Sequence, residues 1–524
     1  MCVFVAATEI HAIQTPRSGS GEFLDVKLPD PSWHRSRGPD SSVEFSEEEL
    51  ARRAAAMEGA WRGGGLDKEE VERYARQLVL PSFGVANQRK LKESSVLVVG
   101  AGGLGSPVCL YLAAAGVGRI GVVDHDHVEK SNLHRQVLHA EVRPKPSIGR
   151  ARTLSLSLNT CSRARRRSRP NPPSSRLPLI PLLFSLSLSL SLVHQDQVGT
   201  HKAVSASISM HRLNSTTTVE THVDGFRPKA ALKLVEGYDV VVDASDNPAT
   251  RYCVNDACVI AKRPLVSGAA IGTDGQLSVY NHGEGGPCYR CVWPDPPASG
   301  SCQRCSDHGV LGVLPGIIGT LQALETIKVI TGIGECTSGK LLMFDGLCTG
   351  FRTLKLRGRQ ASCAACGPEA TITRDTIAAY DYEAKCGGPM HDRGEGACLK
   401  VLGKDRRVSC SRLSERMEEA VGRGGDRDFV LLDVRPRPEF DFAHLPGSVS
   451  LPMEDLEEAA SGGEGAGLGA YVDNGKDVLV VCRRGNDSQV AVRRLEEAGV
   501  ANAFDVEGGL QSWSKTVDPT FPLY

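Results

Sequence analysis

Cys482 has the setting of a reactive cysteine. In "VCRRGNDSQVAVRRL", which begins at Val481, it follows an apolar run and precedes an expected helix, with two arginines, a glycine and an Asn-Asp pair between. A buried structural cysteine would have apolar neighbours, whereas these neighbours favour a thiolate or another sulfur anion. The loop amides and the helix N-terminus can hold such an anion, and Arg483 is expected to lower the pKa of the thiol.

Two kinds of enzyme use a cysteine in such a loop. A phosphatase of the Cys-x5-Arg type needs an arginine six positions after the cysteine, but Ser488 occupies that position. The six-residue loop 482–487 is also short for a phosphate group. These features argue against a phosphatase and leave sulfur transfer, in which the cysteine carries a persulfide, as the other interpretation.

A second candidate site is the glycine run "GAGGLG" from Gly100 to Gly105. It follows the apolar strand pattern "SVLVV" and precedes an Ala- and Leu-rich helix pattern, so its backbone can approach a phosphate at a helix N-terminus. Asp124 ends the next apolar run about 20 residues on, where an acid can bind a ribose hydroxyl. On these residues alone a dinucleotide-dependent dehydrogenase is the first interpretation.

Three Cys-x-x-Cys pairs offer metal ligands. They are Cys288 with Cys291, Cys302 with Cys305, and Cys363 with Cys366. Any two pairs could supply the four thiolates of a tetrahedral zinc site, and spacing alone does not choose between them.

Three further motifs change the interpretation of the glycine run. "ERYARQ" precedes it, "SNLHRQ" follows Asp124, and "DASDN" ends a later buried strand. Together they resemble the ubiquitin-activating-like adenylyltransferases, which use ATP to convert the C-terminal carboxylate of a small carrier protein into an acyl adenylate. Such chemistry needs positive charge and a metal ion around the phosphates.

The resemblance assigns roles to individual residues. It implies that Arg76 reaches the phosphates of a partner subunit, which makes the protein a homodimer, and that Asp246 binds Mg²⁺. It also implies an ATP-binding set, which consists of Gly103, Asp124, Ser131, Asn132, Leu133, His134, Arg135, Lys202, Asp246 and Asn247. Among the cysteine pairs it selects Cys288, Cys291, Cys363 and Cys366 for one structural Zn²⁺, and it places Cys305 where the family has a cysteine that engages the activated carrier.

Residues 142–197 interrupt this pattern. The family has a lysine in a Gly-x-x-Lys-Ala setting soon after "RQVLHAE", but here that lysine is Lys202, after a segment of clustered arginines, prolines and the repeat "SLSLSLSLSLV". A structureless segment of this length inside a compact domain is anomalous. We interpret 142–197 as a low-complexity insertion and hypothesise that it is a translated intron, because its valine and glutamine borders are compatible with splice-site codons.

The patterns between these motifs predict an α/β protein. Alternating apolar strands and helices over 67–141 and 198–387 favour a doubly wound, mostly parallel sheet, the expected ATP-binding adenylyltransferase domain. A Gly-rich linker, 388–407, leads to a smaller α/β domain over 408–524. There "LLDVRPRPEFDFAHLPGSVSLP", the Cys482 loop and "VEGGLQSW" resemble a rhodanese domain. We expect 1–66 to be disordered apart from one helix at 45–61.

The composition limits the possible partners and the possible location of the protein. The formal net charge of −1 argues against general attraction to nucleic acid or to membranes. Seventeen cysteines behind an N-terminus without an apolar signal segment favour a reducing compartment, and the apolar segment 177–193 is too short and too serine-rich to be a membrane anchor.

The combination of both domains resembles the eukaryotic family of molybdopterin-synthase adenylyltransferases and sulfurtransferases. This resemblance implies carrier thiocarboxylate formation for molybdopterin synthesis and for 2-thiolation of the tRNA wobble uridine, in the cytosol. The implied partners are the small molybdopterin-synthase subunit, the ubiquitin-related modifier and a cysteine desulfurase, without direct nucleic-acid binding. Two alternatives stay open, namely an activator that forms only a thioester, and an inactive scaffold in which the insertion disrupts the ATP site.

Overall fold

The computed structural model describes residues 64–141, 197–296, 309–387, 400–460 and 475–523, and singly residues 46, 390 and 469. The chain divides into two compact units, Met1–His391 and Asp392–Tyr524. The predictions of a helix at 45–61, apart from Ser46, of the repeat in the insertion and of a carrier-engaging Cys305 fall outside the described residues.

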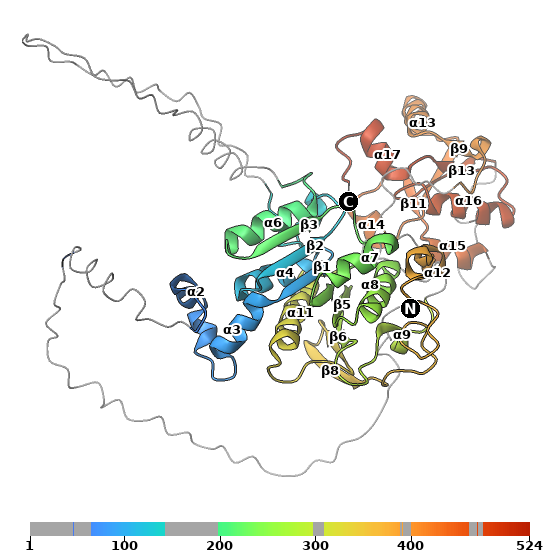
Figure 1. The fold of residues 1–524 in the computed structure, drawn as a ribbon. Coiled ribbons are helices and arrows are strands. Elements are labelled where there is room, and N and C mark those ends of the chain that lie inside the picture. The colour runs from blue at the N-terminus through green and yellow to red at the C-terminus, as the bar shows by residue number, and fades with distance from the viewer. Residues whose placement is uncertain are drawn as a thin grey trace, which may run out of the picture. The chain divides into compact units, whose positions relative to one another are not determined.

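An eight-stranded sheet forms the first unit, in the order β3-β2-β1-β4-β5-β6-β7-β8 (Figure 1). Its first five strands run parallel, and β6 to β8 continue it antiparallel. The bounds are β1 Ser95–Val99, β2 Arg119–Val123, β3 Thr218–His222, β4 Val240–Asp243, β5 Leu265–Ile271, β6 Asp274–Tyr280, β7 Lys340–Asp345 and β8 Gly350–Lys355. This confirms the predicted α/β class with a mostly parallel sheet.

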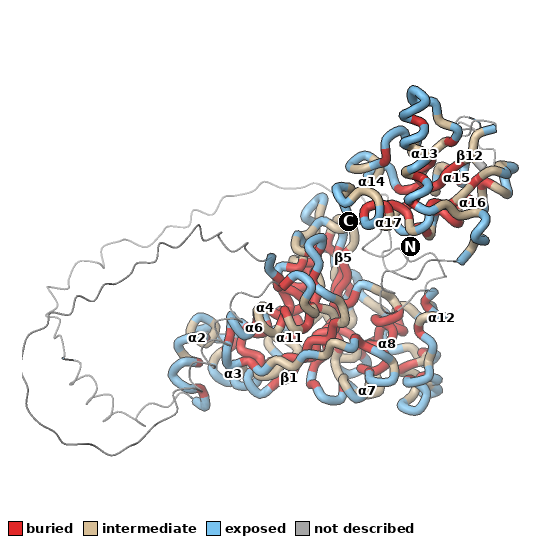
Figure 2. The backbone as a smooth tube through the Cα atoms, turned by 90° about the horizontal axis from the view of Figure 1, so that it is seen from above, coloured by how far each residue is buried: buried red, intermediate tan, exposed pale blue. Residues whose placement is uncertain are grey.

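Helices cover both faces of this sheet. The apolar side chains of α4, α6 and α11 pack into one core cluster, and those of α7 and α8 pack into a second. Because both faces are covered, central strands such as β1 are buried at every residue, as the uninterrupted run "SVLVV" indicates (Figure 2). The helices of this unit are α2 Lys68–Leu78, α3 Gly84–Glu93, α4 Gly105–Ala115, η2 Lys130–Asn132, α6 Lys202–Leu213, α7 Pro228–Glu236, α8 Pro248–Ile260, α9 Tyr289–Val292, α11 Val313–Thr331, η3 Ile377–Ala379 and α12 Tyr382–Cys386.

Helix α11 is long and apolar enough to cross a membrane by length and composition. It places Leu314, Ile318 and Ala323 in the first core cluster instead, against the sheet. Its hydrophobicity is that of a core helix of an α/β fold.

The second unit is a smaller α/β fold with a five-stranded parallel sheet, ordered β11-β10-β12-β13-β9. Apolar residues of α15 and α16 cover one face, and those of α13 and α17 cover the other. The bounds are η4 Lys404–Arg406, β9 Arg407–Val408, α13 Cys410–Gly422, β10 Phe429–Asp433, α14 Arg437–Phe442, β11 Ser448–Ser450, α15 Met453–Ala460, β12 Asp477–Val481, α16 Asp487–Glu497, β13 Ala503–Val506 and α17 Gly509–Thr516.

Candidate active sites and metal centre

The glycine run forms the turn between β1 and α4, at the carboxyl end of the parallel strands. Gly100 has a φ of +100°, and a Cβ there would lie 2.6 Å from the carbonyl oxygen of Ala244. A Cβ on Gly105 would lie 1.9 Å from the carbonyl oxygen of Gly100. Only glycine fits these two positions, and the turn therefore leaves backbone amides at the start of α4 open to a phosphate group.

Asp124 lies beside this turn, directly after β2. Its carboxylate accepts hydrogen bonds from the backbone N–H groups of Ala101, at 2.7 Å, and Asp126, at 2.9 Å. Burial raises the pKa of Asp124, while the nearby Lys202 ammonium and these two N–H groups act in the opposite direction. The predicted nucleotide acid is therefore tied to the glycine turn.

Lys202 begins α6, and its buried Nζ lies 2.8 Å from Oδ2 of Asp126. Burial lowers the pKa of Lys202, but three nearby carboxylates raise it above the usual lysine value, so the ammonium stays charged. These carboxylates belong to Asp124, Asp126 and Asp246. The structure therefore brings Lys202 to the glycine-turn site although 142–197 separates the two in sequence.

The segment from Ser131 to Arg135 also lies beside the glycine turn. Nη2 of Arg135 donates to Oδ1 of the buried Asn132 at 2.7 Å, and a Cβ built on Gly103 would lie 3.6 Å from Cγ of Arg135. Of the other predicted residues in this segment, Leu133 is half-buried, and Ser131 and His134 are exposed. The aliphatic stem of Arg135 thus lies beside the turn, and its guanidinium contacts Asn132.

Asp246 and Asn247 follow β4. Asn247 caps α8, because its Oδ1 accepts from the N–H of Thr250 at 2.9 Å, and its Nδ2 donates to the carbonyl oxygen of Met390 at 3.1 Å. Asp246 is exposed and close enough to Lys202 to affect its pKa. The exposed carboxylate of Asp246 is therefore free of the capping duty that occupies Asn247.

Arg76 lies near the end of α2 with an exposed side chain. The neighbouring Tyr74 is buried, which fixes the helix face that packs on the unit and leaves Arg76 outward. The role predicted for Arg76 in a partner subunit stays a prediction.

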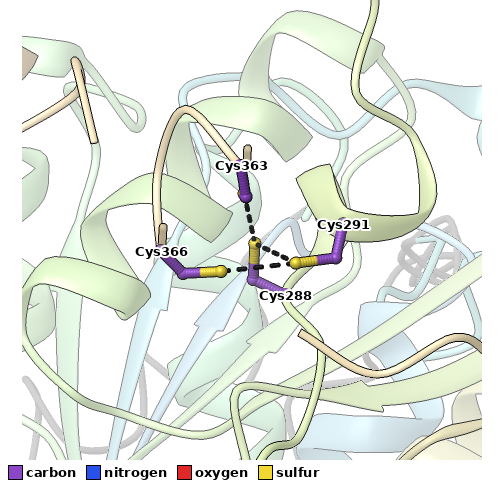
Figure 3. A group of neighbouring side chains, drawn as sticks. All are labelled: Cys288, Cys291, Cys363 and Cys366. Carbon is purple, nitrogen blue, oxygen red and sulfur yellow. Dashed lines mark hydrogen bonds between the residues drawn. The ribbon is translucent and has the colours of Figure 1, made fainter. Parts of the chain in front are cut away.

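Four cysteines form a cluster in the first unit (Figure 3). The Sγ atoms of Cys288 and Cys363 are 3.5 Å apart, those of Cys288 and Cys291 3.8 Å, and those of Cys291 and Cys366 3.3 Å. Tetrahedral thiolates about 2.3 Å from a zinc ion would be separated by about 3.8 Å. The spacing therefore fits one such ion, held by residues around α9 and by the loop after β8.

The second unit places Cys482 directly after β12, again at the carboxyl end of parallel strands. Its Sγ is almost fully buried, accepts from the N–H of Gly485 at 3.1 Å and lies 3.2 Å from Oγ of Ser488. Burial and the charge of Asp487 raise the pKa of the thiol. Desolvation is the largest cause, so the thiol pKa is raised although its loop carries the half-exposed Arg483. That Arg483 helps to lower this pKa stays a prediction.

The "VEGGLQSW" segment supports this loop. Gly508 and Gly509 have φ values of +72° and +57°, and a Cβ on Gly509 would lie 2.2 Å from the carbonyl oxygen of Cys482. That oxygen accepts from the N–H of Leu510 at 2.9 Å. The glycine pair is therefore what lets the chain pack directly against the backbone of the cysteine loop.

Asp433 and Arg435 form a buried ion pair in the same unit. Nη2 of Arg435 lies 2.6 Å from Oδ2 of Asp433, and it also donates to the carbonyl oxygen of Ala443 at 2.7 Å. These bonds join the end of β10 to the segment after α14, so the pair braces the fold.

Comparison with known proteins covers both units of the chain. Residues 74–157 and 190–365 match the ThiF family, and residues 415–516 match the rhodanese-like domain. The chain belongs to the ThiF family. Adenylyltransferase and sulfurtransferase MOCS3-2 of Zea mays is 42% identical over 461 residues, which are 88% of this chain and 82% of that protein.

Other relatives are named for the same two activities. Adenylyltransferase and sulfurtransferase MOCS3 of Arabidopsis thaliana is 41% identical over 88% of this chain and 87% of that protein, and MOCS3 of Anopheles gambiae is 42% identical over 88% and 90%. The solved structure of E. coli MccB with MccA-N7isoASN shares 19% identity, covers 62% of this chain and 84% of that chain, and has a TM-score of 0.42, too low to add to the assignment. This ThiF-family chain is an enzyme, an adenylyltransferase and sulfurtransferase.

The unmatched residues 158–189 of this ThiF-family chain lie inside the predicted insertion 142–197. The interpretation of that segment as a translated intron stays a hypothesis.

Two groups of buried residues escaped the sequence analysis. Beneath the "DASDN" loop, Nε of Arg251 lies 2.9 Å from Oδ2 of the buried Asp243, and Nε2 of Gln322 donates to the carbonyl oxygen of Asp243 at 2.7 Å. In the second unit Ser488 bonds Asp505. The first aspartate of "DASDN" was a signal for the former, but the partners come from distant segments and no local spacing reveals them.

Proposed function

We propose that this protein adenylates the C-terminal glycine of a small ubiquitin-like sulfur-carrier protein and then converts the adenylate into a thiocarboxylate with sulfur carried by Cys482. The observation that carries the proposal is the presence on one chain of a cation-lined glycine turn and a cysteine loop whose amide faces the sulfur. Each site handles an anion, and the two anions are the reactants of consecutive steps.

In the first step the carrier carboxylate attacks the α-phosphate of ATP and pyrophosphate leaves. The amides of the glycine turn with Arg135 and Lys202 would hold the phosphates, Asp124 the ribose, and Asp246 a Mg²⁺ ion. When bound, magnesium neutralises phosphate charge that develops in the transition state. Lys202 is suited to this duty because neighbouring carboxylates keep it charged despite its burial.

In the second step the outer sulfur of a Cys482 persulfide attacks the acyl carbon, and AMP leaves. Attack by the Cys305 thiolate on the Cys482 sulfur of the resulting acyl disulfide would release the thiocarboxylate and leave a Cys305–Cys482 disulfide, which a dithiol reductant reopens. Cys305 lies outside the described residues, so its part rests on the family resemblance alone.

The proposal extends to partners and setting. The carriers are the small molybdopterin-synthase subunit and the ubiquitin-related modifier, with a cysteine desulfurase as sulfur donor. Arg76 would complete the ATP site of a second copy in a homodimer, one Zn²⁺ would occupy the four-cysteine cluster as a structural ion, and the protein would act in the cytosol. The products serve molybdopterin synthesis and 2-thiolation of the tRNA wobble uridine.

A thiocarboxylate assay tests the proposal. Carrier protein, ATP and thiosulfate are incubated with the full chain and with a variant that lacks 142–197, and the carrier is weighed by mass spectrometry for the replacement of one oxygen by sulfur. The proposal expects this product. If the carrier forms only a thioester with the enzyme, the chain is a thioester-only activator. If the full chain shows no ATP–pyrophosphate exchange but the deletion variant does, the insertion inactivates the ATP site.

A further inference from the structure

A line of three buried side chains leads away from the Cys482 sulfur. Sγ of Cys482 lies 3.2 Å from Oγ of Ser488, and Ser488 Oγ donates to Oδ1 of Asp505 at 2.6 Å. Ser488 and Asp505 have no exposed surface, and Cys482 is 1% exposed. The three residues come from the position directly after β12, the first turn of α16 and strand β13. No solvent therefore needs to enter for a proton to travel along this line.

The hydrogen positions follow from the chemistry of the three groups. An ionised carboxylate only accepts hydrogen bonds, so the single hydroxyl proton of Ser488 points to Asp505. The oxygen of Ser488 is then an acceptor for the S–H group of Cys482. Once the sulfur is an anion, Ser488 can donate to it only if Asp505 has taken up a proton and donates in turn.

We propose that Ser488 and Asp505 form a proton relay that removes the thiol proton of Cys482 when the sulfur reacts. The S–H proton passes to Oγ of Ser488 while the Ser488 hydroxyl proton passes to Oδ1 of Asp505. One proton moves from sulfur to carboxylate, one negative charge moves from carboxylate to sulfur, and no oxidant or reductant is involved. The relay rests on the proposed role of Cys482 as the residue that carries sulfur.

The charged groups around Asp505 determine how readily its carboxylate accepts the proton. Asp505 faces Arg407 of β9, with Nε 2.8 Å from Oδ2, and Glu507 just after its own strand. Burial raises the pKa of Asp505 against the effect of Ser488 and Arg407, which makes this carboxylate a better proton acceptor than an exposed one. Cys410 of α13 also lies within electrostatic range of Asp505.

The sulfur end of the line has its own neighbours. Burial and the charge of Asp487 raise the pKa of the Cys482 thiol, whereas backbone N–H groups of the loop act to lower it, as does the Ser488 hydroxyl once it donates to the sulfur anion. Thiol and carboxylate are therefore the resting pair, and the proton crosses only as the sulfur attacks. Such transfer is general base catalysis through one intervening hydroxyl.

Thiosulfate gives a balanced test reaction. The Cys482 sulfur bonds to the outer sulfur of thiosulfate, the sulfur–sulfur bond of thiosulfate breaks, and sulfite leaves with its electron pair. The former thiol proton is then on Ser488, and Asp505 holds the former hydroxyl proton of Ser488. Sulfur uptake is measured on the full chain as the mass gain of the Cys482 peptide, over pH 7 to 9.5, with C482A as the blank.

The decisive variant is D505N, which keeps the size of the side chain but cannot take up the proton. The relay predicts that sulfur uptake at pH 7 falls about 10²-fold, at the low end of what a positioned general base contributes, and that the deficit narrows as pH rises because hydroxide replaces the relay. A purely electrostatic role predicts the reverse sign, since loss of a nearby negative charge favours the thiolate. Uptake equal to or faster than that of the unchanged chain at pH 7 would overturn the relay.

Two further sets of variants guard against misfolding as the cause. D433N removes a buried carboxylate from the Asp433–Arg435 pair at the end of β10, which pairs with β12. We expect D433N to change the melting temperature about as much as D505N does. The pH profile of sulfur uptake should keep its shape in D433N. S488A should lose uptake as D505N does, while S488T, which keeps the hydroxyl, should retain most of it; equal rates for S488A and the unchanged chain would also overturn the relay. If the unchanged chain itself takes up no sulfur, the proposed function fails instead.

Discussion

The glycine turn after β1 and the cysteine loop after β12 occupy equivalent places in two different sheets. Each lies at the carboxyl end of a central parallel strand, and each leads into a helix, α4 or α16. The first gathers charged side chains from distant segments, among them Lys202 and Arg135, whereas the second contacts its sulfur with backbone N–H groups of the loop and one hydroxyl. A polyphosphate spreads several charges over many atoms and needs cations, but a single sulfur anion is held by local dipoles.

Substitution of Lys202 by methionine should have the largest effect and should separate the two sites. Loss of one buried cation at developing phosphate charge is expected to lower ATP–pyrophosphate exchange by about 10²- to 10³-fold. Sulfur uptake by Cys482 from thiosulfate should stay unchanged, because the cysteine loop belongs to another unit. A loss of both activities would break the comparison by showing that the sites do not work independently.

The four-cysteine cluster offers a test that involves neither site directly. We expect one zinc ion per chain by elemental analysis and its loss in C363S, with a fall in melting temperature, because three thiolates and a hydroxyl bind zinc more weakly than four thiolates. C348S, which alters an exposed cysteine outside the cluster, is the matched control and should keep the metal. Zinc retained at full stoichiometry in C363S would remove the cluster as the metal site.

Substitution of Gly509 by alanine tests the packing that supports the sulfur site. Gly509 and Gly424 both have positive φ, but a Cβ on Gly509 would meet the Cys482 carbonyl oxygen at 2.2 Å, whereas one on Gly424 meets nothing within 4 Å. Backbone strain alone costs about 1–2 kcal/mol at either position, so G509A should lose more stability than G424A and should also lower sulfur uptake. Equal free energies of unfolding for both variants would mean that the loop yields to the added methyl group.

The smallest effect is expected from D487N. Asp487 raises the pKa of the Cys482 thiol from an exposed position, so removal of its charge should lower that pKa. The pH at which Cys482 alkylation by iodoacetamide reaches half its maximum should move down by the same amount. A higher midpoint pH in D487N would mean that Asp487 acts through a contact that supports the loop and not through its charge.

The sequence predicted well where chemistry is local. The glycine run with its flanking apolar patterns sufficed for the β1–α4 turn, whereas the four cysteines were selected by the family resemblance and not by their spacing. The sequence failed where burial decides the chemistry, because nothing around Arg483 shows that the Cys482 sulfur is desolvated and its thiol pKa raised. It also missed Asp505, which reaches the sulfur only through the pairing of β12 with β13.

The most direct test of the whole account uses Cys482→Ala in the full chain, with carrier protein, ATP and thiosulfate. Pyrophosphate exchange and carrier thiocarboxylate are measured in the same sample. We predict unchanged exchange, since the glycine turn and Lys202 are intact, together with complete loss of thiocarboxylate. Thiocarboxylate formed at the normal rate by Cys482→Ala would contradict the claim that the cysteine loop supplies the sulfur.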